Sequence, residues 1–296
     1  MSKKLRTQEE IECVCKKALK DYLETPEFKR SLTQLQKKYN IRRQTLSEKF
    51  KQWGYQVVNQ QNRCRMNENA FDNIHTEEQF YWLGFMYADG NISSVGNRIE
   101  VRLSYKDLEH LEKFRKFLNL SAKIRTGVCN GNPFCHLSIR NKHMWNTLYS
   151  YGCIPRKSLI LTYPNISTLT GENVYHFIRG YVDGDGCLCT YMRKNTMQTR
   201  LDLVGTEAFL EKIKEKLQEK GYIKNKTSKN WKNQAYSLMY SNVPSRRIAR
   251  LLYTHATIYL ERKYQKFLEF CRIEEGSSKR KSSKVDRPCN GNIEVN

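Results

Sequence analysis

The sequence predicts an α+β fold in which one order of helices and strands occurs twice, after a small all-helical region. Two observations carry this prediction. The segments FYWLGFMYADG at 80–90 and HFIRGYVDGDG at 176–186 resemble each other, and similar patterns follow both. Residues 1–57 form a highly charged zone with helical patterns. Hydrophobic residues make up 39% of the 296 residues, which is enough for a sizeable core.

The two copies match in position and in order. The same spacing separates the members of three matched pairs, which are Gly84 and Gly180, Asp89 and Asp185, and Gly90 and Gly186. Each segment is followed by an alternating, strand-like run, IEVRLSYKD or TRLDLVGT, and then by a helical stretch. Further strand-like pieces, CHLSIRN and AYSLMYSN, precede a short closing helix. Both copies therefore predict helix, strands, helix, strands, helix.

These patterns divide the chain into five parts. Residues 58–75 are polar and rich in Asn and Gln, as is typical of a linker. The end of the chain is low in apolar residues, which predicts disorder. The parts are a helical region at 1–57, the linker at 58–75, a first repeat at 76–165, a second repeat at 166–275 and a disordered basic tail at 276–296.

A strong excess of positive charge indicates a polyanionic partner. The chain carries 52 Lys and Arg against 30 Asp and Glu, a net charge of +22. Because phosphate neutralisation supplies most non-specific affinity for nucleic acid, we expect nucleic acid as the partner. An anionic membrane surface is the alternative. The sequence has neither a transmembrane run nor a basic amphipathic helix with a strongly apolar face, so no membrane is expected.

The cysteines favour reduced thiols over a metal site or disulfides. There are ten cysteines, none in the C-x-x-C spacing of an ordinary zinc site. The pairs Cys13/Cys15 and Cys187/Cys189 are too close and too few for one. The N-terminus also lacks an apolar signal region. We therefore expect a cytoplasmic protein, in a bacterium or a phage-infected host cell.

The repeated acidic segments predict a metal-binding centre. Thr76 and Gln79 make a capping box before the first helix. Glycine inside a helix costs roughly 1 kcal/mol against alanine, so Gly84 and Gly180 predict two helices in close approach at a pseudo-two-fold axis. Each helix ends at Asp-Gly, where a carboxylate opposes the helix dipole. A divalent cation such as Mg²⁺ would remove this penalty. Two ordinary Asp-Gly turns in a duplicated fold are the alternative.

WLGFMYADG and IRGYVDGDG resemble the two dodecapeptide motifs of LAGLIDADG homing endonucleases, over roughly residues 75–270. The resemblance implies a monomer with two pseudo-symmetric αββαββα repeats, whose sheets form a saddle over double-stranded DNA. It also implies site-specific, metal-dependent phosphodiester hydrolysis that leaves a staggered double-strand break, an activity associated with intron mobility. The chain ends Val295-Asn296 without a following nucleophile, so we expect a free-standing enzyme rather than an intein.

The resemblance assigns roles to particular residues. Asp89 and Asp185 are the expected catalytic acids, and they bind Mg²⁺ together with Gly90 and Gly186. A lysine that follows the closing helix of each repeat is expected to stabilise charge on the phosphate. These lysines are Lys157 and, more clearly, Lys263, for which phosphate positioning or simple solvation is the alternative.

The two copies differ at the sixth motif position, which is usually acidic in the family. Tyr87 stands there in the first copy and Asp183 in the second. This position is usually a supporting one, so the difference leaves catalysis in place. It predicts that the two halves are unequal.

Polar faces of the predicted strands are expected to lie on the DNA. Arg can bond guanine edges bidentately in the major groove, whereas Lys more often contacts phosphate. A solvated charged face is the alternative for any single residue. The candidates are Arg98, Arg102, Ser104, Lys123, Arg125, His136, Ser138 and Arg140 in the first repeat, and Arg193, Arg200 and Asp202 in the second.

The N-terminal region resembles the helix–turn–helix of bacterial and phage regulators. In SLTQLQKKYNIRRQTLSEKFKQWGY, Ser31 is suited to cap a first helix, Asn40 and Ile41 to form the turn, and Arg43 to begin a second helix. A plain helical hairpin is the alternative. The second helix would present a DNA-recognition surface made of Arg42, Arg43, Gln44, Thr45, Ser47 and Lys51.

Two other functions stay open at the level of sequence. A DNA-binding regulator that does not cut could use the same fold, but a pure binder needs neither Asp89 nor Asp185. An intron RNA maturase could also use the same basic faces, because they suit RNA as well as DNA. Binding to intron RNA would discriminate the maturase from the nuclease.

Overall fold

The computed structural model describes the chain outside residues 1–6, 27–29, 58–64, 222–226, 231–234 and 286–296. The chain forms two compact units. Unit one comprises Met1–Asn67 with Asn119–Ala122, and unit two comprises Glu68–Leu118 with Lys123–Asn296. Each unit is described separately below.

Unit one is a small bundle of helices α1 (Gln8–Glu24), α2 (Leu32–Tyr39) and α3 (Arg43–Gln52). Thr7 and Glu10 form a capping box for α1, and Ser31 caps α2. Asn40 ends α2 in the left-handed conformation, which asparagine tolerates better than most residues. The core of the bundle is made of Cys15, Ala18, Leu19, Tyr22, Leu35, Ile41, Leu46 and Phe50.

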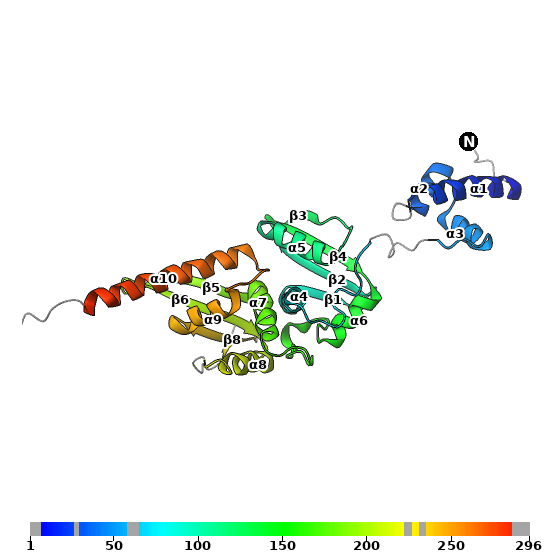
Figure 1. The fold of residues 1–296 in the computed structure, drawn as a ribbon. Helices are drawn as coiled ribbons and strands as arrows, with labels where there is room; N and C mark the ends of the chain where they lie inside the picture. The colour runs from blue at the N-terminus through cyan, green and yellow to red at the C-terminus, as the bar shows by residue number, and fades with distance from the viewer. Residues whose placement is uncertain (1–6, 27–29, 58–64, 222–226, 231–234, 286–296) are drawn as a thin grey trace, which may run out of the picture. The chain divides into compact units, whose positions relative to one another are not determined.

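Unit two contains the predicted order twice. The first repeat runs α4 (Glu77–Ala88), β1 (Gly90–Ser93), β2 (Arg98–Ser104), α5 (Leu108–Phe117), β3 (Arg125–Cys129), β4 (Asn132–Arg140) and α6 (Lys142–Ser150). The second runs α7 (Asn173–Asp185), β5 (Gly186–Arg193), β6 (Thr196–Gly205), α8 (Glu207–Gln218), β7 (Thr227–Asn230), β8 (Ala235–Ser241) and α9 (Val243–Tyr253). The α+β fold with two αββαββα repeats is confirmed (Figure 1).

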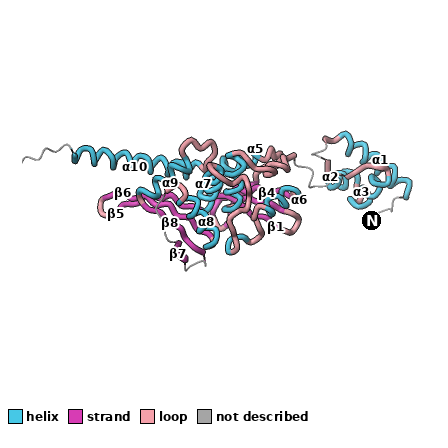
Figure 2. Tube along the Cα trace, turned by 60° about the horizontal axis from the view of Figure 1, so that its bottom comes forward, coloured by secondary structure: helices cyan, strands magenta, loops and turns pink. Residues whose placement is uncertain are grey.

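Each repeat folds its strands into one four-stranded antiparallel sheet. The strand orders, β1-β2-β4-β3 and β5-β6-β8-β7, are the same in both repeats. Burial alternates along β2, where Ile99, Val101 and Leu103 are buried between more exposed neighbours. In the second repeat α7 and α9 lie along one side of the strands, as Figure 2 shows. Each sheet therefore keeps one face packed under helices and leaves the other face polar.

The motif helices α4 and α7 pack directly against each other at the centre of unit two (Figure 1). Their glycines make this contact. A Cβ on Gly84 would overlap the carbonyl oxygen of Phe177, and one on Gly180 would overlap the carbonyl oxygen of Tyr81. The matched glycines therefore allow backbone-to-backbone packing about a pseudo-two-fold axis. Thr76 and Gln79 form the predicted capping box at the start of α4.

Two predicted boundaries differ from the structure. Part of the predicted linker belongs to unit two, because Ala70, Phe71 and Ile74 are buried there and Phe71 packs edge-on against Phe117. Three apolar side chains among many asparagines were enough to fix this segment. Residues 65–67 of the predicted linker belong to unit one, and residues 58–64 lie outside the described residues.

The last helix is also longer than predicted. Helix α10 spans Glu261–Val285 and so continues ten residues into the segment for which disorder was predicted. Low apolar content argues against a packed core, but it does not prevent a lysine-rich segment from extending an existing helix, since lysine is a good helix former. Residues 286–296 lie outside the described part of the chain. Among the described residues, no helix has the length and apolar character needed to cross a membrane.

Candidate active site and nucleic-acid interface

The two motif aspartates lie together where α4 and α7 end. Asp89 is the C-cap of α4, and Asp185 is the last residue of α7. A Cβ on Gly184 would overlap the Cβ of Ala88 and lie 3.3 Å from Oδ2 of Asp89, so the two helix ends are in contact. Desolvation, and next to it the charge of Asp185, raise the pKa of Asp89 to about 6. The glycine packing thus brings two carboxylates into one partly desolvated site.

The two predicted lysines occupy equivalent places beside these acids. The ammonium of Lys157 donates a hydrogen bond to the carbonyl of Gly90, and that of Lys263 donates one to the carbonyl of Gly186. Lys263 is 6% exposed. Desolvation lowers the pKa of both lysines, while nearby carboxylates oppose that change. Each repeat therefore contributes one carboxylate and one lysine, of which Lys263 is buried and Lys157 half-buried.

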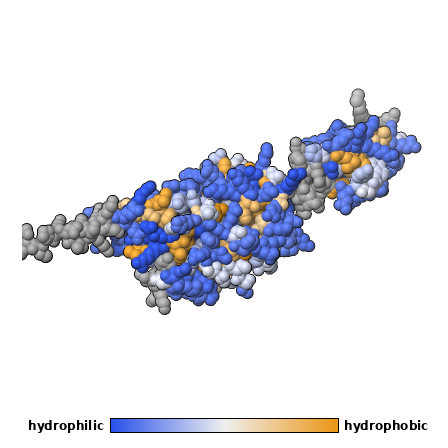
Figure 3. Space-filling model, viewed as in Figure 1, coloured by the Kyte–Doolittle hydropathy of each residue, from blue (hydrophilic) through white to orange (hydrophobic). Residues whose placement is uncertain are grey.

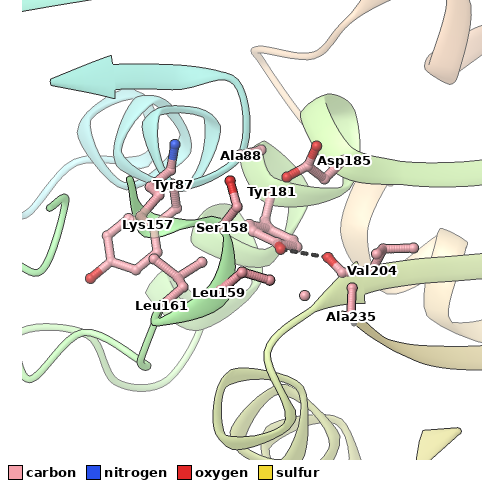
Figure 4. A pocket seen from close by; sticks show the side chains of 11 residues that line it. Tyr87, Ala88, Lys157, Ser158, Leu159, Leu161, Tyr181, Asp185, Val204 and Ala235 are labelled. Carbon is pink, nitrogen blue, oxygen red and sulfur yellow. Dashed lines mark hydrogen bonds between the residues drawn. The ribbon is translucent and has the colours of Figure 1, made fainter. Parts of the chain in front are cut away.

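Two cavities flank this centre. One, of about 250 Å³, is lined by Lys157, Ala88 and Asp185 among others, and Figure 4 shows these three around it. The other, of about 370 Å³, is lined by Asp89 together with Arg102 and His136 from the first sheet. Desolvation also raises the pKa of Asp185, and the two lysines oppose this shift. Each acid therefore faces a space of its own.

The donors at this centre fit Mg²⁺ better than a transition metal. Two carboxylates and the carbonyls that follow them are hard oxygen ligands, and Mg²⁺ completes such a set with water and phosphate oxygens. Among the described residues, no group of three or more His, Cys, Asp or Glu could hold a metal by itself. A cation would also relieve the repulsion between the acids. The glycine carbonyls already accept hydrogen bonds from the lysines, so the carboxylates are the better-supported ligands.

The predicted DNA-contacting residues of the first repeat lie on one face of its sheet. Strand register places Arg98 opposite Arg140, and Arg102 opposite His136. Each alternates with buried residues of β2 or β4, so this is the face without helices. The same face carries Ser104, Arg125 and Ser138, whereas Lys123 is exposed just before β3.

The second sheet presents a comparable but less basic face. Arg193 and Arg200 lie on the same side of β5 and β6 as Asp202, with which Arg200 forms an ion pair of 2.8 Å. Cys187 and Cys189 also alternate onto this side. Polar residues cover most of the face of unit two seen in Figure 3, with apolar patches between them. The halves are therefore unequal in their exposed chemistry as well as in their motifs.

Sequence reasoning missed an acid in the middle of the first face. Glu100 accepts a hydrogen bond from Ser138 at 3.1 Å and lies 3.4 Å from both Arg98 and His136. It pairs across the strands with Asn91, just as Asp202 pairs with Cys187, so Glu100 and Asp202 are equivalent. The register counted from each motif aspartate could have revealed this match. Glu100 therefore holds the polar ends of Arg98, His136 and Ser138 together on this face.

A buried polar network behind the centre was also missed. Asp183 is fully buried and accepts hydrogen bonds from the hydroxyls of Tyr81 and Tyr253 and from the amide of Leu260. Desolvation raises the pKa of Asp183, and the three hydrogen bonds oppose this. Arg179, 2% exposed, donates to the carbonyls of Leu252 and Ile258 and to Glu77. Nothing in the sequence pattern except its place in the motif helix marked Arg179.

Low pH will destabilise the fold because of His110, which is buried beside this network. His110 lies 3.0 Å from the hydroxyl of Tyr81, and desolvation, aided by Lys113 and Arg262, lowers its pKa to about 3. The unfolded chain protonates this imidazole more readily than the folded protein does. The free energy of unfolding is therefore unaffected by this histidine above about pH 6.5, and it falls as the pH drops toward 3. The expected loss is about 1.4 kcal/mol per pH unit in that window.

Urea unfolding at pH 7 and pH 5 checks this, with the intact protein and His110→Gln compared side by side. The intact protein should lose more stability between the two pH values than the variant. Equal losses would mean that His110 does not titrate as its burial implies.

The predicted recognition residues of unit one lie on the outside of the bundle. Arg42, Arg43 and Gln44 are exposed at the start of α3, and Thr45 and Ser47 are half-buried. Leu46 and Phe50 on the opposite side of α3 are fully buried. Lys51 is exposed one turn after Ser47. The helix therefore offers a polar surface at its N-terminal end.

Comparisons with known proteins identify similar folds only among solved structures. No family model matches the sequence, and no curated protein matches it. The LAGLIDADG meganuclease I-AabMI bound to uncleaved DNA is 12% identical, with a TM-score of 0.48, over 68% of this chain and 91% of that one.

Two further solved structures have similar values. The I-LtrWI LAGLIDADG homing endonuclease bound to target DNA is 13% identical, with a TM-score of 0.46, over 73% of this chain and 99% of that one. I-SmaMI bound to an uncleaved DNA target in the presence of calcium ions is 13% identical, with a TM-score of 0.49, over 68% and 92%. We therefore infer function from the residues of this chain itself.

Proposed function

We propose that the protein is a LAGLIDADG-type homing endonuclease that binds double-stranded DNA and hydrolyses one phosphodiester in each strand with Mg²⁺, leaving a staggered break. The observation that carries this proposal is the paired centre. Asp89 and Asp185 meet at the ends of two packed helices, and each repeat adds a lysine at an equivalent place. Two strands of opposite polarity can be cut by two such sets of groups related by a two-fold axis.

Each group at the centre has a separate task. The carboxylates of Asp89 and Asp185 hold the metal, which when bound activates water and stabilises the leaving oxygen. Lys157 and Lys263 keep positive charge in a partly desolvated place, where it acts more strongly on a phosphate than it would in water. The surrounding protein shields Lys263 almost fully from solvent and Lys157 in part. This division of tasks explains why each half has both a carboxylate and a lysine.

We propose that the protein binds the duplex as a monomer, through the polar faces of its two sheets. Arg98, Arg102 and Arg140 lie on one face of the first sheet, and Arg193 and Arg200 on the matching face of the second. The cavity beside Asp89 includes Arg102 and His136, so the same surface continues into the centre. The chain's net charge of +22 adds long-range attraction to phosphate.

Cleavage of a duplex DNA library tests the proposal. The intact protein is incubated with a genomic or randomised library, with Mg²⁺ or with EDTA, and the ends are sequenced. Discrete staggered breaks that need Mg²⁺ are expected, and they name the target. Tight binding without Mg²⁺ and without cutting would contradict the nuclease proposal and favour a DNA-binding regulator. Selective binding of intron RNA, again without DNA cutting, would favour the maturase.

Unit one is proposed to act as an accessory DNA reader. Arg42 and Arg43 lie exposed at the start of α3, the position from which a recognition helix contacts the major groove. Tethering a second reader to the same chain raises its effective concentration at the target. It therefore adds affinity without any change at the cleavage centre.

Changing Arg42 and Arg43 together to alanine will weaken DNA binding while leaving the cleavage rate of saturated complexes unchanged. Loss of two phosphate contacts should reduce the slope of log K against the logarithm of the salt concentration by about 2 in magnitude. Binding titrations at several salt concentrations measure both quantities. A variant with Lys16 and Lys20 changed to alanine is the matched control, since these lysines are exposed on α1. Equal losses in both variants would indicate only a non-specific charge effect.

A further inference from the structure

The geometry points to the sixth position of each motif, Asp183 in one repeat and Tyr87 in the other, as the positioning residue for the lysine of its own repeat. This inference rests on the proposed function. It gives each strand-cutting half its own support, with different chemistry in the two halves. The contacts that carry it begin in the second repeat.

The segment before α10 is held in place mainly by side chains of the two motif helices. The amide of Thr257 donates to Glu77 of α4 at 2.9 Å, and Arg179 of α7 donates to the carbonyl of Ile258 at 3.0 Å. The amide of Leu260 donates to Asp183 at 2.7 Å. Asp183 thus holds the last residue before the helix begins.

Leu260 in turn starts the helix that carries Lys263. Its carbonyl accepts from the amide of Lys263 at 2.9 Å and from that of Tyr264 at 3.0 Å. The ammonium of Lys263 then reaches the carbonyl of Gly186, three residues after Asp183 along the chain. A shift of Leu260 would therefore reorient the first turn of α10 and displace Lys263 from the centre.

The first repeat uses the same position in a different way. Tyr87, two residues before Asp89 as Asp183 is before Asp185, is 1% exposed, and its hydroxyl donates to the carbonyl of Tyr151. Tyr151 begins the segment that leads to Lys157, whose ammonium reaches the carbonyl of Gly90. In both repeats, then, one buried side chain joins the motif helix to the backbone that delivers the lysine.

The two supports differ in strength. Asp183 accepts three hydrogen bonds, including 2.7 Å from Tyr81 and 2.5 Å from Tyr253, whereas the structure gives Tyr87 one hydrogen bond from its hydroxyl. A carboxylate that receives three donors is hard to replace, because each donor left unpaired in a buried site costs free energy. Loss of Asp183 should therefore disturb its half more than loss of Tyr87 disturbs the other.

Strand-specific cleavage kinetics test this inference in the full-length protein. Asp183→Asn should slow the cutting of one strand by about 10- to 100-fold, since a small displacement of a catalytic group has an effect of that size. Tyr87→Phe should slow the other strand by a smaller factor. Nicked plasmid should accumulate with opposite strand bias in the two variants, and the dissociation constant for DNA should stay the same.

The matched control is Tyr181→Phe. Tyr181 lies on α7 and is as buried as Tyr87, and it lines the cavity beside Lys157, but its hydroxyl donates to the carbonyl of Val204 in β6 and not to the backbone that leads to either lysine. It should slow both strands to the same extent. If Asp183→Asn does the same, Asp183 supports only the helix interface and the inference is wrong. The double variant Asp183→Asn with Lys263→Met should cut no more slowly than Lys263→Met alone.

A second readout does not depend on cleavage. Amide hydrogen exchange at residues 258–264 should become faster in Asp183→Asn and stay unchanged in Tyr87→Phe, whether or not the protein cuts DNA. Unchanged exchange would overturn the inference while leaving the nuclease intact. An intact protein that cuts no DNA would instead overturn the proposed function. If Asp183→Asn does not fold, Tyr253→Phe removes one donor from the same carboxylate and should show the same strand bias.

Discussion

Asp89→Asn and Asp185→Asn will each lose cleavage by at least about a thousandfold, which corresponds to about 4 kcal/mol of transition-state stabilisation. Asparagine keeps the shape of aspartate but has no charge to hold a divalent cation. Because the two acids share one centre, loss of either should affect both strands or leave only slow nicking. Rates on an end-labelled target duplex, with Mg²⁺ at saturation, measure the loss for each strand.

The same substitution at Asp89 will stabilise the metal-free fold at alkaline pH. The pKa of Asp89 is raised to about 6, from 3.8, by desolvation and by Asp185. The folded state therefore binds this proton more readily than the unfolded chain does, and stability is lost as the pH rises through this window. With EDTA at pH 8, Asp89→Asn should be about 1 to 3 kcal/mol more stable than the intact protein. The difference should vanish below about pH 4.

A variant at an acid far from the centre provides the control for both measurements. Glu215 is exposed on α8, where it forms an exposed ion pair with Lys212. Glu215→Gln should cut at the normal rate and show no such stabilisation. If Asp89→Asn is inactive because it is unfolded, urea unfolding will reveal it. An active Asp89→Asn would exclude Asp89 as a metal ligand.

The sequence allowed the elements and their faces to be predicted because these depend on neighbouring residues. Alternation of Ile99, Val101 and Leu103 with polar residues was enough to place Arg98 and Arg102 on one face of β2. The spacing of Gly84 and Gly180 was enough to predict close packing of the motif helices. Such patterns are local or repeat at a fixed offset, so one sequence contains them.

The partners of buried polar residues could not be predicted, because they are set by contacts between distant segments. Asp183 meets Tyr81 across the helix interface and Leu260 from beyond the closing helix. Arg179 meets the carbonyl of Leu252 in α9 and that of Ile258 in the loop that follows α9. Neither pairing has a spacing rule, and burying a charge depends on all of its partners at once. The acid Glu100 was missed for a related reason, since its meaning comes from the register between β1 and β2.

Replacing Gly180 by alanine will destabilise unit two by about 3 kcal/mol or more, in spite of the gain of about 1 kcal/mol in helix propensity. The new methyl group would meet the backbone carbonyl of Tyr81 and the amide of Phe85, neither of which can rotate away as a side chain can. The helices would have to separate, and with them Asp89 and Asp185. Cleavage should therefore fall together with stability.

Urea unfolding of Gly180→Ala, with Gly171→Ala as the control, tests this packing. Gly171 has a φ of 57° and no atom within 4 Å of the position of a Cβ, so its replacement costs only about 1–2 kcal/mol of backbone strain. A loss at Gly180 no larger than that at Gly171 would mean that α4 and α7 can move apart freely. The pair of aspartates would then not be held together by the glycines, and the two-fold centre would need another support. The opposite outcome is a strong fall in stability in Gly180→Ala and Gly84→Ala but not in Gly171→Ala. That result would tie the spacing of the acids directly to the repeated glycine.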